Sequence, residues 1–455
     1  MSPTSKHIEN YIKPGCRVHL VGIGGVSMRP LGLVLRGMGM DISGSDMSQS
    51  PATEDFIAKN VPIHIGHRAE NIQGAECLIR TAAVHNDNPE IAAARALGIP
   101  IFERAQAWGH LMKSYKHAIC LSGTHGKTTT TSMMAHIAMA AELDPTIMIG
   151  GHLPLLGAGH RVGQGDTIIM ESCEYCNSFH KFFPTVAVIL NVEADHLDFF
   201  KDLIDVEQSF RKFAMLVPEG GHIIANGDDQ NTIDTLADLD YVTFGFGAGN
   251  NIRALRCCED FHTFDVAVDG QFYGHFELSV VGKHNVYNAL AAISVAVQFG
   301  ISADVVAAGL STFTGAGRRM ERKGTFQGAD VYDDYAHHPG ELHALLTAVK
   351  TLPYDRIICA FQPHTYTRTN ALFDDFVREL KQVDVAVLAE IYAAREQNTI
   401  GISSSQLADE IPGAVYCETL PEVTECLKEI ARPGDLILTV GAGDIFKAGE
   451  ALVRK

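Results

Sequence analysis

Short runs of apolar, β-branched residues alternate along most of the chain with stretches in which apolar residues recur every three or four positions. The first pair is the strand-like run of residues 17–25, RVHLVGIGG, and the helical pattern of residues 26–39, VSMRPLGLVLRGMG. Residues 40–46, MDISGSD, predict a second strand with its turn. This alternation is typical of βα units on parallel sheets, and it predicts an α/β protein.

Three blocks of this alternation predict three domains. The first, residues 1–115, begins like a dinucleotide-binding, Rossmann-like fold and ends at the polar stretch KSYK. The second, residues 116–315, contains a β-rich insert with glycine and aspartate turns and a long helical pattern, and it ends at the glycines of TFTGAGRR. The third, residues 316–455, repeats the alternation and predicts another open, Rossmann-like sheet.

The composition is that of a folded globular protein, and it limits the partners of the chain. Of its 455 residues 46% are hydrophobic and 20% charged, so each block is able to form a packed core. The formal net charge of -18 argues against a broad attraction to nucleic acid or to an anionic membrane surface. We find no run of about 18 apolar residues and no signal-peptide core at the start, so we expect a cytoplasmic protein.

The ten cysteines are scattered through apolar, strand-like runs such as HAICLSG and RIICAF. This distribution differs from the spacing in small, disulfide-rich secreted domains, so we expect reduced and mostly buried thiols. Cys173 and Cys176 form the single CxxC pair, and no second pair lies at the spacing of a zinc site. We therefore favour no metal or redox role for this pair.

The stretch GTHGKTTTT, residues 123–131, is similar to a phosphate-binding loop. The usual pattern G-x-x-x-x-G-K-[ST] would place a glycine where this chain has Leu121. The stretch nevertheless follows a strand-like run and precedes a helical pattern, so backbone N–H groups and the helix dipole would point at an anion. Gly126 would then allow close approach of phosphate, Lys127 would reach the β- and γ-phosphates, and Thr128 would offer its hydroxyl to magnesium. The alternative is a glycine-rich turn with a solvated lysine.

Two further candidate ligands follow strands downstream. Glu171 ends the run DTIIMES, and His196 follows the run VAVILNV. Because ligands collect at the carboxyl ends of parallel strands, both side chains are candidates to bind magnesium together with Thr128. His196 could instead be a capping or surface histidine. Together with Lys127, these residues predict a magnesium–ATP site.

The first block carries a glycine-rich turn after its first strand. Gly22, Gly24 and Gly25 depart from the pattern G-x-G-x-x-G, because Ser27 stands where the third glycine belongs. The turn could hold the diphosphate of NAD, FAD or another nucleotide at a helix N-terminus. Asp46 lies at about the distance expected of a ribose ligand.

The third block carries polar motifs at two predicted strand ends. These are DDYAHHP, residues 333–339, and FQPHTYTRT, residues 361–369. Their histidine, arginine and tyrosine side chains suit the binding of a carboxylate or the stabilisation of a transferring phosphoryl group. The alternative is that they are helix N-caps and surface polar residues.

Taken in order, these motifs resemble those of the Mur ligase family. The motifs are GIGG, GTHGKTTTT, ExxE, NxxxDHLD, GKHNxxNALAA, GRRxE, DDYAHHP and HTYTRT, and they cover nearly the whole chain. The resemblance implies a Rossmann-like UDP-binding domain, a central P-loop domain that binds ATP, and a C-terminal ligase domain. It also implies that ATP phosphorylates the lactyl carboxylate of UDP-N-acetylmuramate, and that the amine of L-alanine then forms an amide with release of ADP and phosphate.

The resemblance further implies roles for individual residues. The residues that would bind ATP are Gly123, Thr124, His125, Gly126, Lys127, Thr128, Thr129, His284, Asn285, Asn288, Arg319 and Asp334. Those that would bind the UDP-sugar are Gly22, Gly24, Gly25, Ser45, Asp46 and Asn177, and those for the amino acid are His337, Tyr366 and Arg368. The ligands of Mg²⁺ would be Thr128, Glu171 and His196, and the catalytic residues Lys127, Glu174, His196, His338 and Arg368.

Three positions depart from the family pattern. Cys173 stands where members often have an acid, and Thr365 where they often have an arginine. Arg211 stands where several relatives carry a carbamylated lysine, so we expect no carbamylation here.

Two other functions stay open. A ligase of the same family that attaches a whole tripeptide to UDP-N-acetylmuramate would share the nucleotide machinery, although GIGGVSM and HTYTRT favour alanine. An NAD-dependent oxidoreductase that uses the first domain would leave the loop around Lys127 unexplained. A monomer and a homodimer are both compatible with the sequence.

Overall fold

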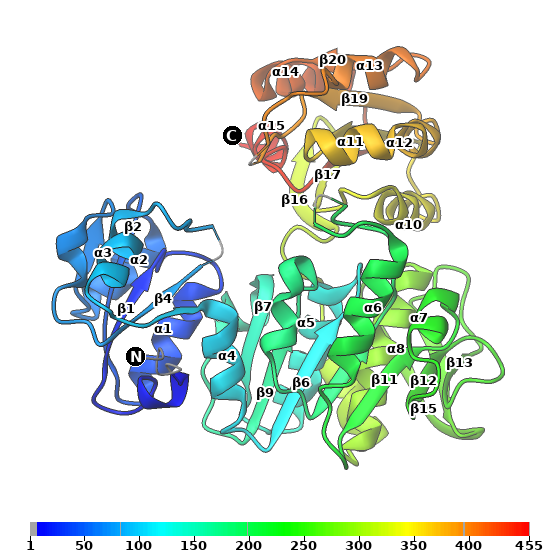
Figure 1. The fold of residues 1–455 in the computed structure, drawn as a ribbon. Helices are drawn as coiled ribbons and strands as arrows, with labels where there is room; N and C mark the ends of the chain where they lie inside the picture. Colours follow the sequence, from blue (N-terminus) through cyan, green and yellow to red (C-terminus); the bar gives the residue numbers. More distant parts are fainter. Residues whose placement is uncertain (1–6, 82, 198, 395, 455) are drawn as a thin grey trace.

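The computed structural model of the protein describes residues 7–81, 83–197, 199–394 and 396–454. Its three β-sheets use separate parts of the chain, and Figure 1 shows them as three bodies, with the C-terminal one stacked on the central one. The α/β fold with three domains is therefore confirmed. The limits at residues 115 and 315 stay predictions; each falls in a connection between two sheets.

The N-terminal domain is a parallel, five-stranded sheet in the order β3-β2-β1-β4-β5. Its strands are β1 (Arg17–Val21), β2 (Asp41–Asp46), β3 (Ile63–Ile65), β4 (Cys77–Arg80) and β5 (Ile101–Glu103). Its helices are η1 (Ile8–Asn10), α1 (Met28–Gly37), α2 (Pro51–Ala58), η2 (Ala69–Ile72), α3 (Pro89–Ala96) and α4 (Arg104–Met112). The strand order reverses at β1, so the loop after β1 lies at the switch point where open α/β sheets bind ligands.

The central domain is a ten-stranded sheet in the order β15-β14-β13-β12-β11-β10-β6-β9-β7-β8. Its strands are β6 (His117–Ser122), β7 (Thr146–Leu153), β8 (Ala158–Arg161), β9 (Thr167–Glu171), β10 (Val186–Ile189), β11 (His222–Asn226), β12 (Val242–Gly245), β13 (Ile252–Leu255), β14 (Thr263–Val268) and β15 (Gln271–Glu277). Its helices are α5 (Lys127–Ala140), η3 (Pro154–Leu156), η4 (Tyr175–Lys181), α6 (Leu203–Ala214), α7 (Gln230–Thr235), α8 (Lys283–Gln298) and α9 (Ala303–Ser311). The β-rich insert extends this same sheet, because β12 pairs in parallel with β11.

The C-terminal domain is a six-stranded sheet in the order β16-β17-β21-β18-β19-β20, with β16 as its antiparallel edge. Its strands are β16 (Glu321–Phe326), β17 (Ala329–Asp334), β18 (Arg356–Phe361), β19 (Val385–Ala389), β20 (Val415–Cys417) and β21 (Asp435–Val440). Its helices are α10 (Pro339–Val349), α11 (Tyr366–Ala371), α12 (Phe373–Leu380), α13 (Ser404–Asp409), α14 (Leu420–Ile430) and α15 (Phe446–Val453).

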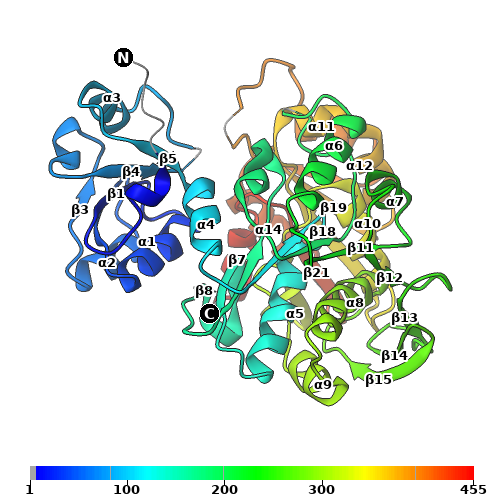
Figure 2. The same cartoon turned by 60° about the horizontal axis from the view of Figure 1, so that its bottom comes forward.

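Helix α4 joins the N-terminal domain to the central one, and Figure 2 shows it between the two. Trp108 and Phe179 belong to one buried apolar cluster that includes side chains of both domains. Gly109 brings α4 against the backbone of η4, since a Cβ at this position would lie 1.8 Å from the carbonyl oxygen of Lys181. This close approach fixes the N-terminal domain on the central one.

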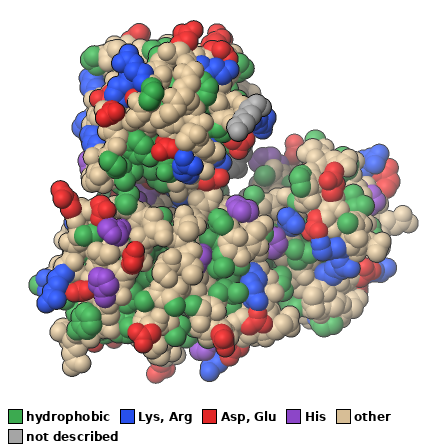
Figure 3. All heavy atoms as spheres, turned by 180° about the vertical axis from the view of Figure 1, so that it is seen from behind, with side chains coloured by type: hydrophobic (Ala, Val, Ile, Leu, Met, Phe, Trp, Pro, Cys, Tyr) green, Lys and Arg blue, Asp and Glu red, His purple; other side chains and the backbone are tan. Residues whose placement is uncertain are grey.

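In Figure 1 the C-terminal domain lies above the central domain and the N-terminal domain lies beside it, and a notch separates the N-terminal and C-terminal domains when the molecule is seen from behind (Figure 3). Most predicted site residues lie in the loops after β1, β6, β9, β10, β17 and β18, at the end of β2 or in α8, and all three domains therefore contribute to the site. Among the described residues, no helix is long and apolar enough to cross a membrane.

Candidate active site

The loop between β6 and α5 has the conformation of a phosphate cradle. Gly126 caps α5 with a φ of 83°, a conformation that glycine adopts at little cost. A Cβ there would lie 2.5 Å from Oδ1 of Asn288, so the loop also packs closely on α8. The amides in the first turn of a helix have no carbonyl partner within it, so those at the start of α5 are available to an anion.

Lys127 folds back under this loop. Its Nζ donates to the carbonyl oxygen of Thr124 at 2.9 Å and to the Glu174 carboxylate at 3.0 and 3.2 Å. Burial lowers the pKa of Lys127, but the Glu174 carboxylate outweighs it, and the pKa lies above its ordinary value. The ammonium group is therefore charged and already partly neutralised, so a bound triphosphate would compete with Glu174 for it.

Thr128 and Glu171 offer oxygen ligands beside the cradle. The Thr128 hydroxyl donates to Oε1 of Glu171 at 3.0 Å, and the amide of Gly150 donates to Oε2 at 2.6 Å. Two neighbouring ligands of an octahedral Mg²⁺, each at about 2.1 Å, lie about 3 Å apart. The two oxygen atoms therefore fit one Mg²⁺ without rearrangement of the backbone.

His196 faces a different carboxylate. Its Nε2 lies 3.7 Å from Oε1 of Glu174, and its ring lies against Tyr175 with centroids 4.7 Å apart. Its φ of 53° places it in the left-handed region, which turns the loop after β10 back toward η4. The structure thus pairs Thr128 with Glu171 and His196 with Glu174, around the Lys127 ammonium.

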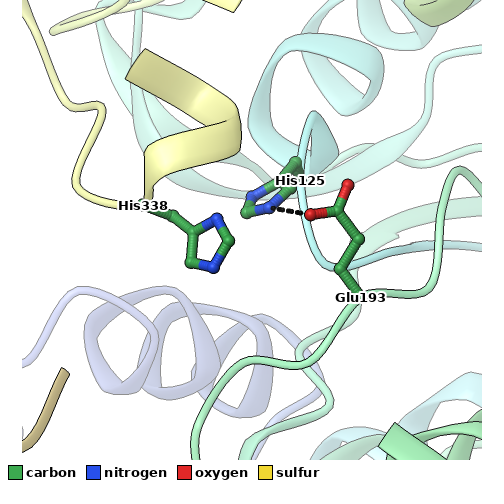
Figure 4. Close-up of side chains that lie close together, drawn as sticks. All are labelled: His125, Glu193 and His338. Carbon is green, nitrogen blue, oxygen red and sulfur yellow. Dashed lines mark ion pairs between the residues drawn. The ribbon is translucent and has the colours of Figure 1, made fainter. Parts of the chain in front are cut away.

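His125, Glu193 and His338 meet above the cradle (Figure 4). His125 Nε2 lies 3.4 Å from Glu193, and its Nδ1 lies 3.3 Å from Glu341 on α10. Burial lowers the pKa of His125, but the two carboxylates outweigh it and raise the pKa to about 10. A protonated ring places positive charge at ion-pair distance from both carboxylates, so we interpret this cluster as an imidazolium bridge between two domains and not as a metal site.

His338 caps α10 and stays neutral. Its Nδ1 accepts from the amide of Gly340 at 3.3 Å, and burial together with the charge on His125 lowers its pKa. Its Nε2 is buried and has no hydrogen-bond partner among the described residues. Because Nδ1 is an acceptor, Nε2 carries the proton and is available to donate to a ligand.

A cavity of about 700 Å³ lies between the cradle, α8 and the C-terminal domain. Most residues predicted to bind ATP line it: His125, Gly126, Thr129, His284, Asn285, Asn288, Arg319 and Asp334. The other four, Gly123, Thr124, Lys127 and Thr128, lie at the end of the loop that faces Glu171 and Glu174. The volume is in the range of small-molecule sites.

Charged groups from the C-terminal domain close this cavity. Arg319 lies 3.7 Å from Glu341 and stacks on the ring of Tyr335. Burial raises the pKa of Asp334 to about 6, and this carboxyl group accepts from the amides of Met320 and Ala336, each at 2.8 Å. Asp334 therefore also shapes the loop that carries Arg319.

Arg368 ties the C-terminal domain to the central one. Its guanidinium donates to Oδ1 of Asp195 at 2.9 and 3.2 Å. Burial raises the pKa of Asp195, but Arg368 outweighs it, and the pKa lies well below its ordinary value. His337 lies near His364, with ring centroids 5.8 Å apart, and Tyr366 is half-buried at the start of α11.

The glycine turn after β1 stands beside the predicted UDP-sugar residues. The amide of Gly24 donates to Oδ2 of Asp46 at 2.9 Å, so this carboxylate holds the turn in place. The Ser45 hydroxyl is fully buried and donates to Glu90 at 2.6 Å. Asn177 lies apart from them on η4, where it accepts from Ser209.

Glu90 is the buried centre of this N-terminal network, and sequence reasoning missed it. Its Oε1 accepts from Asn71 at 2.6 Å, and Oε2 lies 3.4 Å from His67 and 3.6 Å from His19. Burial raises the pKa of Glu90, but these partners and Ser45 outweigh it and lower the pKa to about 2. Its place in the sequence, directly after Pro89 in a stretch with helical spacing, did not indicate that its side chain is buried.

The positions that depart from the family pattern have distinct surroundings. Arg211 donates to the carbonyl oxygens of Thr235 and Ala237. Thr365 adopts a φ of 67° directly before α11. All ten cysteines are free thiols, and Cys173 and Cys176 are exposed.

Comparison with known proteins gives matches along nearly the whole chain. Three family models match: "Mur ligase family, catalytic domain" over residues 17–116, "Mur ligase middle domain" over residues 121–296, and "Mur ligase, glutamate ligase domain" over residues 318–443. A protein of Clostridium novyi named UDP-N-acetylmuramate--L-alanine ligase is 44% identical over 450 residues, which is 97% of this chain and 98% of that protein. One of the same name from Caldanaerobacter subterraneus is 43% identical over 448 residues, 96% and 97% of the two chains.

Solved structures agree with these matches. The UDP-N-acetylmuramate-alanine ligase of Thermotoga maritima is 28% identical with a TM-score of 0.80, covering 96% of this chain and 98% of that one. The murein peptide ligase of Psychrobacter arcticus, at 23% identity and a TM-score of 0.71 over 97% and 100% of the chains, shares the fold. The resemblance inferred from the motifs is thereby confirmed, and the chain belongs to the Mur ligase family.

Proposed function

We propose that the protein joins L-alanine to the lactyl carboxylate of UDP-N-acetylmuramate at the expense of ATP. The observation that carries the proposal is the arrangement of Lys127 and Thr128 between two carboxylates, at the mouth of a cavity of nucleotide size. The relatives named for this reaction match nearly the full chain at about 44% identity. The family matches do not favour an NAD-dependent oxidoreductase.

ATP would occupy the cavity with its base near α8 and its phosphates at the cradle. The amides at the start of α5 and the Lys127 ammonium would hold the β- and γ-phosphates. Thr128 and Glu171 would hold Mg²⁺, which when bound neutralises charge on the phosphoryl group. Arg319 would contact the nucleotide from the C-terminal domain, where it already lines the cavity.

In the first step, a carboxylate oxygen of the lactyl group attacks the γ-phosphorus, and the bond to ADP breaks. In the second, the amine of L-alanine attacks the acyl carbon, phosphate leaves with the former carboxylate oxygen, and the amine loses a proton. Glu174 and His196 lie together beside Lys127, where they would position the lactyl carboxylate. The buried, protonated Nε2 of His338 would donate to the transferring phosphoryl group.

The amino acid would enter from the C-terminal domain. His337, Tyr366 and Arg368 stand on the loops after β17 and β18, which face the central domain. Arg368 pairs with Asp195 of the central domain, and this ion pair would stabilise the closed arrangement of the two domains. In that arrangement the amino-acid residues would face the acyl phosphate, and water would be excluded. We place the protein in the cytoplasm, and a monomer or homodimer stays a prediction.

The test is phosphate release by the purified protein with ATP, Mg²⁺ and UDP-N-acetylmuramate, measured with and without L-alanine. We expect turnover only when L-alanine is present. Lys127→Ala should abolish turnover while UDP-N-acetylmuramate still binds, because Lys127 lies in the central domain. A parallel assay with L-Ala-γ-D-Glu-meso-diaminopimelate decides against the tripeptide ligase, and preference for this tripeptide would overturn the assignment to alanine.

A further inference from the structure

The turn between β13 and β14 gathers three side chains that are typical metal ligands. Cys258, Asp260 and His262 each offer one ligand atom, and these atoms lie within 4.8 Å of one another. Sγ of Cys258 lies 3.0 Å from Oδ1 of Asp260 and 3.5 Å from Nδ1 of His262, and Oδ1 and Nδ1 are 2.5 Å apart. The turn belongs to the β-rich insert, on the side of the central domain where Figure 1 labels β13.

The Asp260 carboxylate accepts hydrogen bonds from two side-chain protons in this arrangement. Its Oδ1 accepts from the thiol of Cys258 and from Nδ1 of His262. One divalent cation could take the place of these two protons, because a thiolate, a carboxylate and a neutral imidazole nitrogen are the ligands that Zn²⁺ prefers. The amide of Thr263 already donates to Sγ at 3.1 Å, and this contact would stabilise a thiolate.

The distances are close to those of a tetrahedral site. With Zn–S near 2.3 Å and Zn–N and Zn–O near 2.1 Å, sulfur and nitrogen ligands lie about 3.6 Å apart and nitrogen and oxygen ligands about 3.4 Å. The distance between Sγ and Nδ1 is 3.5 Å and needs almost no change. Oδ1 must move away from Nδ1 by under about 1 Å and from Sγ, which lies 3.0 Å from it, by about 0.6 Å. Asp260 is half-exposed, so its side chain has solvent beside it to allow this shift.

We propose that Cys258, Asp260 and His262 bind one divalent cation of the Zn²⁺ type, with water as the fourth ligand. On binding, the thiol proton passes to solvent, and the imidazole proton moves from Nδ1 to Nε2. All three side chains are half-exposed, so the ion enters from solvent without opening the domain.

The site lies beside the nucleotide cavity but is distinct from it. The amide of Gly282 donates to the carbonyl oxygen of Asp260 at 3.1 Å, and Gly282 caps α8, which carries His284 and Asn288. A bound ion would therefore hold the turn against the start of α8. It would raise the melting temperature of the protein, because the folded chain brings the three ligands together and so binds the ion more tightly than the unfolded chain does.

The experiment adds Co²⁺ alone to full-length protein that has been stripped of metal with EDTA. A cobalt–thiolate bond gives a near-ultraviolet charge-transfer band that oxygen and nitrogen ligands do not give, so Co²⁺ at the proposed Mg²⁺ site stays silent. We compare the wild type with Cys258→Ser and with Cys257→Ser, its neighbour outside the cluster. Cys173→Ser controls for the exposed thiol near Glu174.

We expect a band that saturates at one Co²⁺ per chain and disappears when Zn²⁺ is added. Cys258→Ser should abolish the band, whereas Cys257→Ser and Cys173→Ser should keep it. His262→Ala should weaken Co²⁺ binding about 100-fold, since loss of a residue that only supports a metal ligand already weakens binding 10–100-fold. The turn is half-exposed, so these variants should fold, and their circular dichroism spectra check this. Absence of the band in the wild type, its persistence in Cys258→Ser, or its loss in Cys173→Ser overturns the proposal.

Discussion

The ion pair between Asp195 and Arg368 is predicted to hold the C-terminal domain on the central one. Asp195→Asn removes the charge of the carboxylate but keeps Oδ1 as the acceptor for the amide of His196, a contact of 2.7 Å. The loop that carries His196 should therefore stay in place. Oδ1 is also the acceptor of the Arg368 guanidinium, so the variant removes the charge–charge attraction across the domain interface and leaves an acceptor in place.

The size of the loss follows from the burial of the pair. The side chains of Arg368 and Asp195 are 11% and 9% exposed, so solvent screens their interaction only weakly. Breaking a buried pair costs about 3–5 kcal/mol when the remaining charge stays buried. Here the domain can open and hydrate Arg368, and the retained Oδ1 can still accept from its guanidinium. We therefore take roughly 2 kcal/mol for the lost charge, the scale of an interaction with a charged group. That corresponds to a population of the closed form about 30-fold lower.

The assay is kcat/KM for ATP in the complete ligase reaction, with small-angle scattering of the protein bound to an ATP analogue. We expect kcat/KM to fall about 30-fold and the radius of gyration to rise. Asp375→Asn is the matched control, because its ion pair with Arg378 is exposed and contributes little. A kcat/KM for Asp195→Asn equal to that of Asp375→Asn would refute the reasoning.

Three further predictions test the N-terminal domain and the cradle. Gly109→Ala should lower the melting temperature, since its Cβ would meet the backbone of Lys181 and such overpacking costs about 1–3 kcal/mol; an unchanged melting curve would contradict this contact. Glu90→Gln should weaken UDP-N-acetylmuramate binding in calorimetry. It should also lower the stability of the folded protein, because the stabilisation by the Glu90 carboxylate is present above the carboxyl pKa of the unfolded chain and falls as pH drops toward about 2. Equal acid-unfolding curves for both proteins would count against this role. His125→Asn should destabilise the folded protein fully below pH about 6.5 and progressively less as pH rises through about 10, because only the imidazolium bridges the carboxylates; a difference that does not depend on pH would exclude that bridge.

The elements that carry the proposed nucleotide site were predictable because local signals determine them. The run HAICLSG, the glycines and the threonines specify a strand, a loop and a helix within 25 residues, and the structure has β6 and α5 there. The strands β3, β4, β5, β7, β8, β13 and β16 were not predicted individually. β3, β4, β5, β8 and β13 have only three or four residues, and β7 and β16 have irregular pairing, so a local pattern indicates them poorly.

The partners of the predicted residues could not be found in the same way. Glu341 reaches His125 only because the C-terminal domain stacks on the central one, and no local pattern reports that arrangement. Asp195 was quoted within a motif, but its role became visible only with Arg368 opposite it. The Ser45 side chain was expected to contact the UDP-sugar, and in the structure its hydroxyl is buried and donates to Glu90. A hydroxyl at a strand end can bind a ligand or a buried carboxylate, and the sequence alone does not distinguish the two.

The central claim is that ATP activates the lactyl carboxylate as an acyl phosphate. The most direct measurement uses UDP-N-acetylmuramate whose lactyl carboxylate is labelled with oxygen-18, together with ATP and L-alanine, and mass spectrometry of the phosphate released. Since the carboxylate oxygen that attacks the γ-phosphorus leaves with it, each phosphate should carry one labelled oxygen. Unlabelled phosphate, formed at the same rate as the amide, would contradict the account.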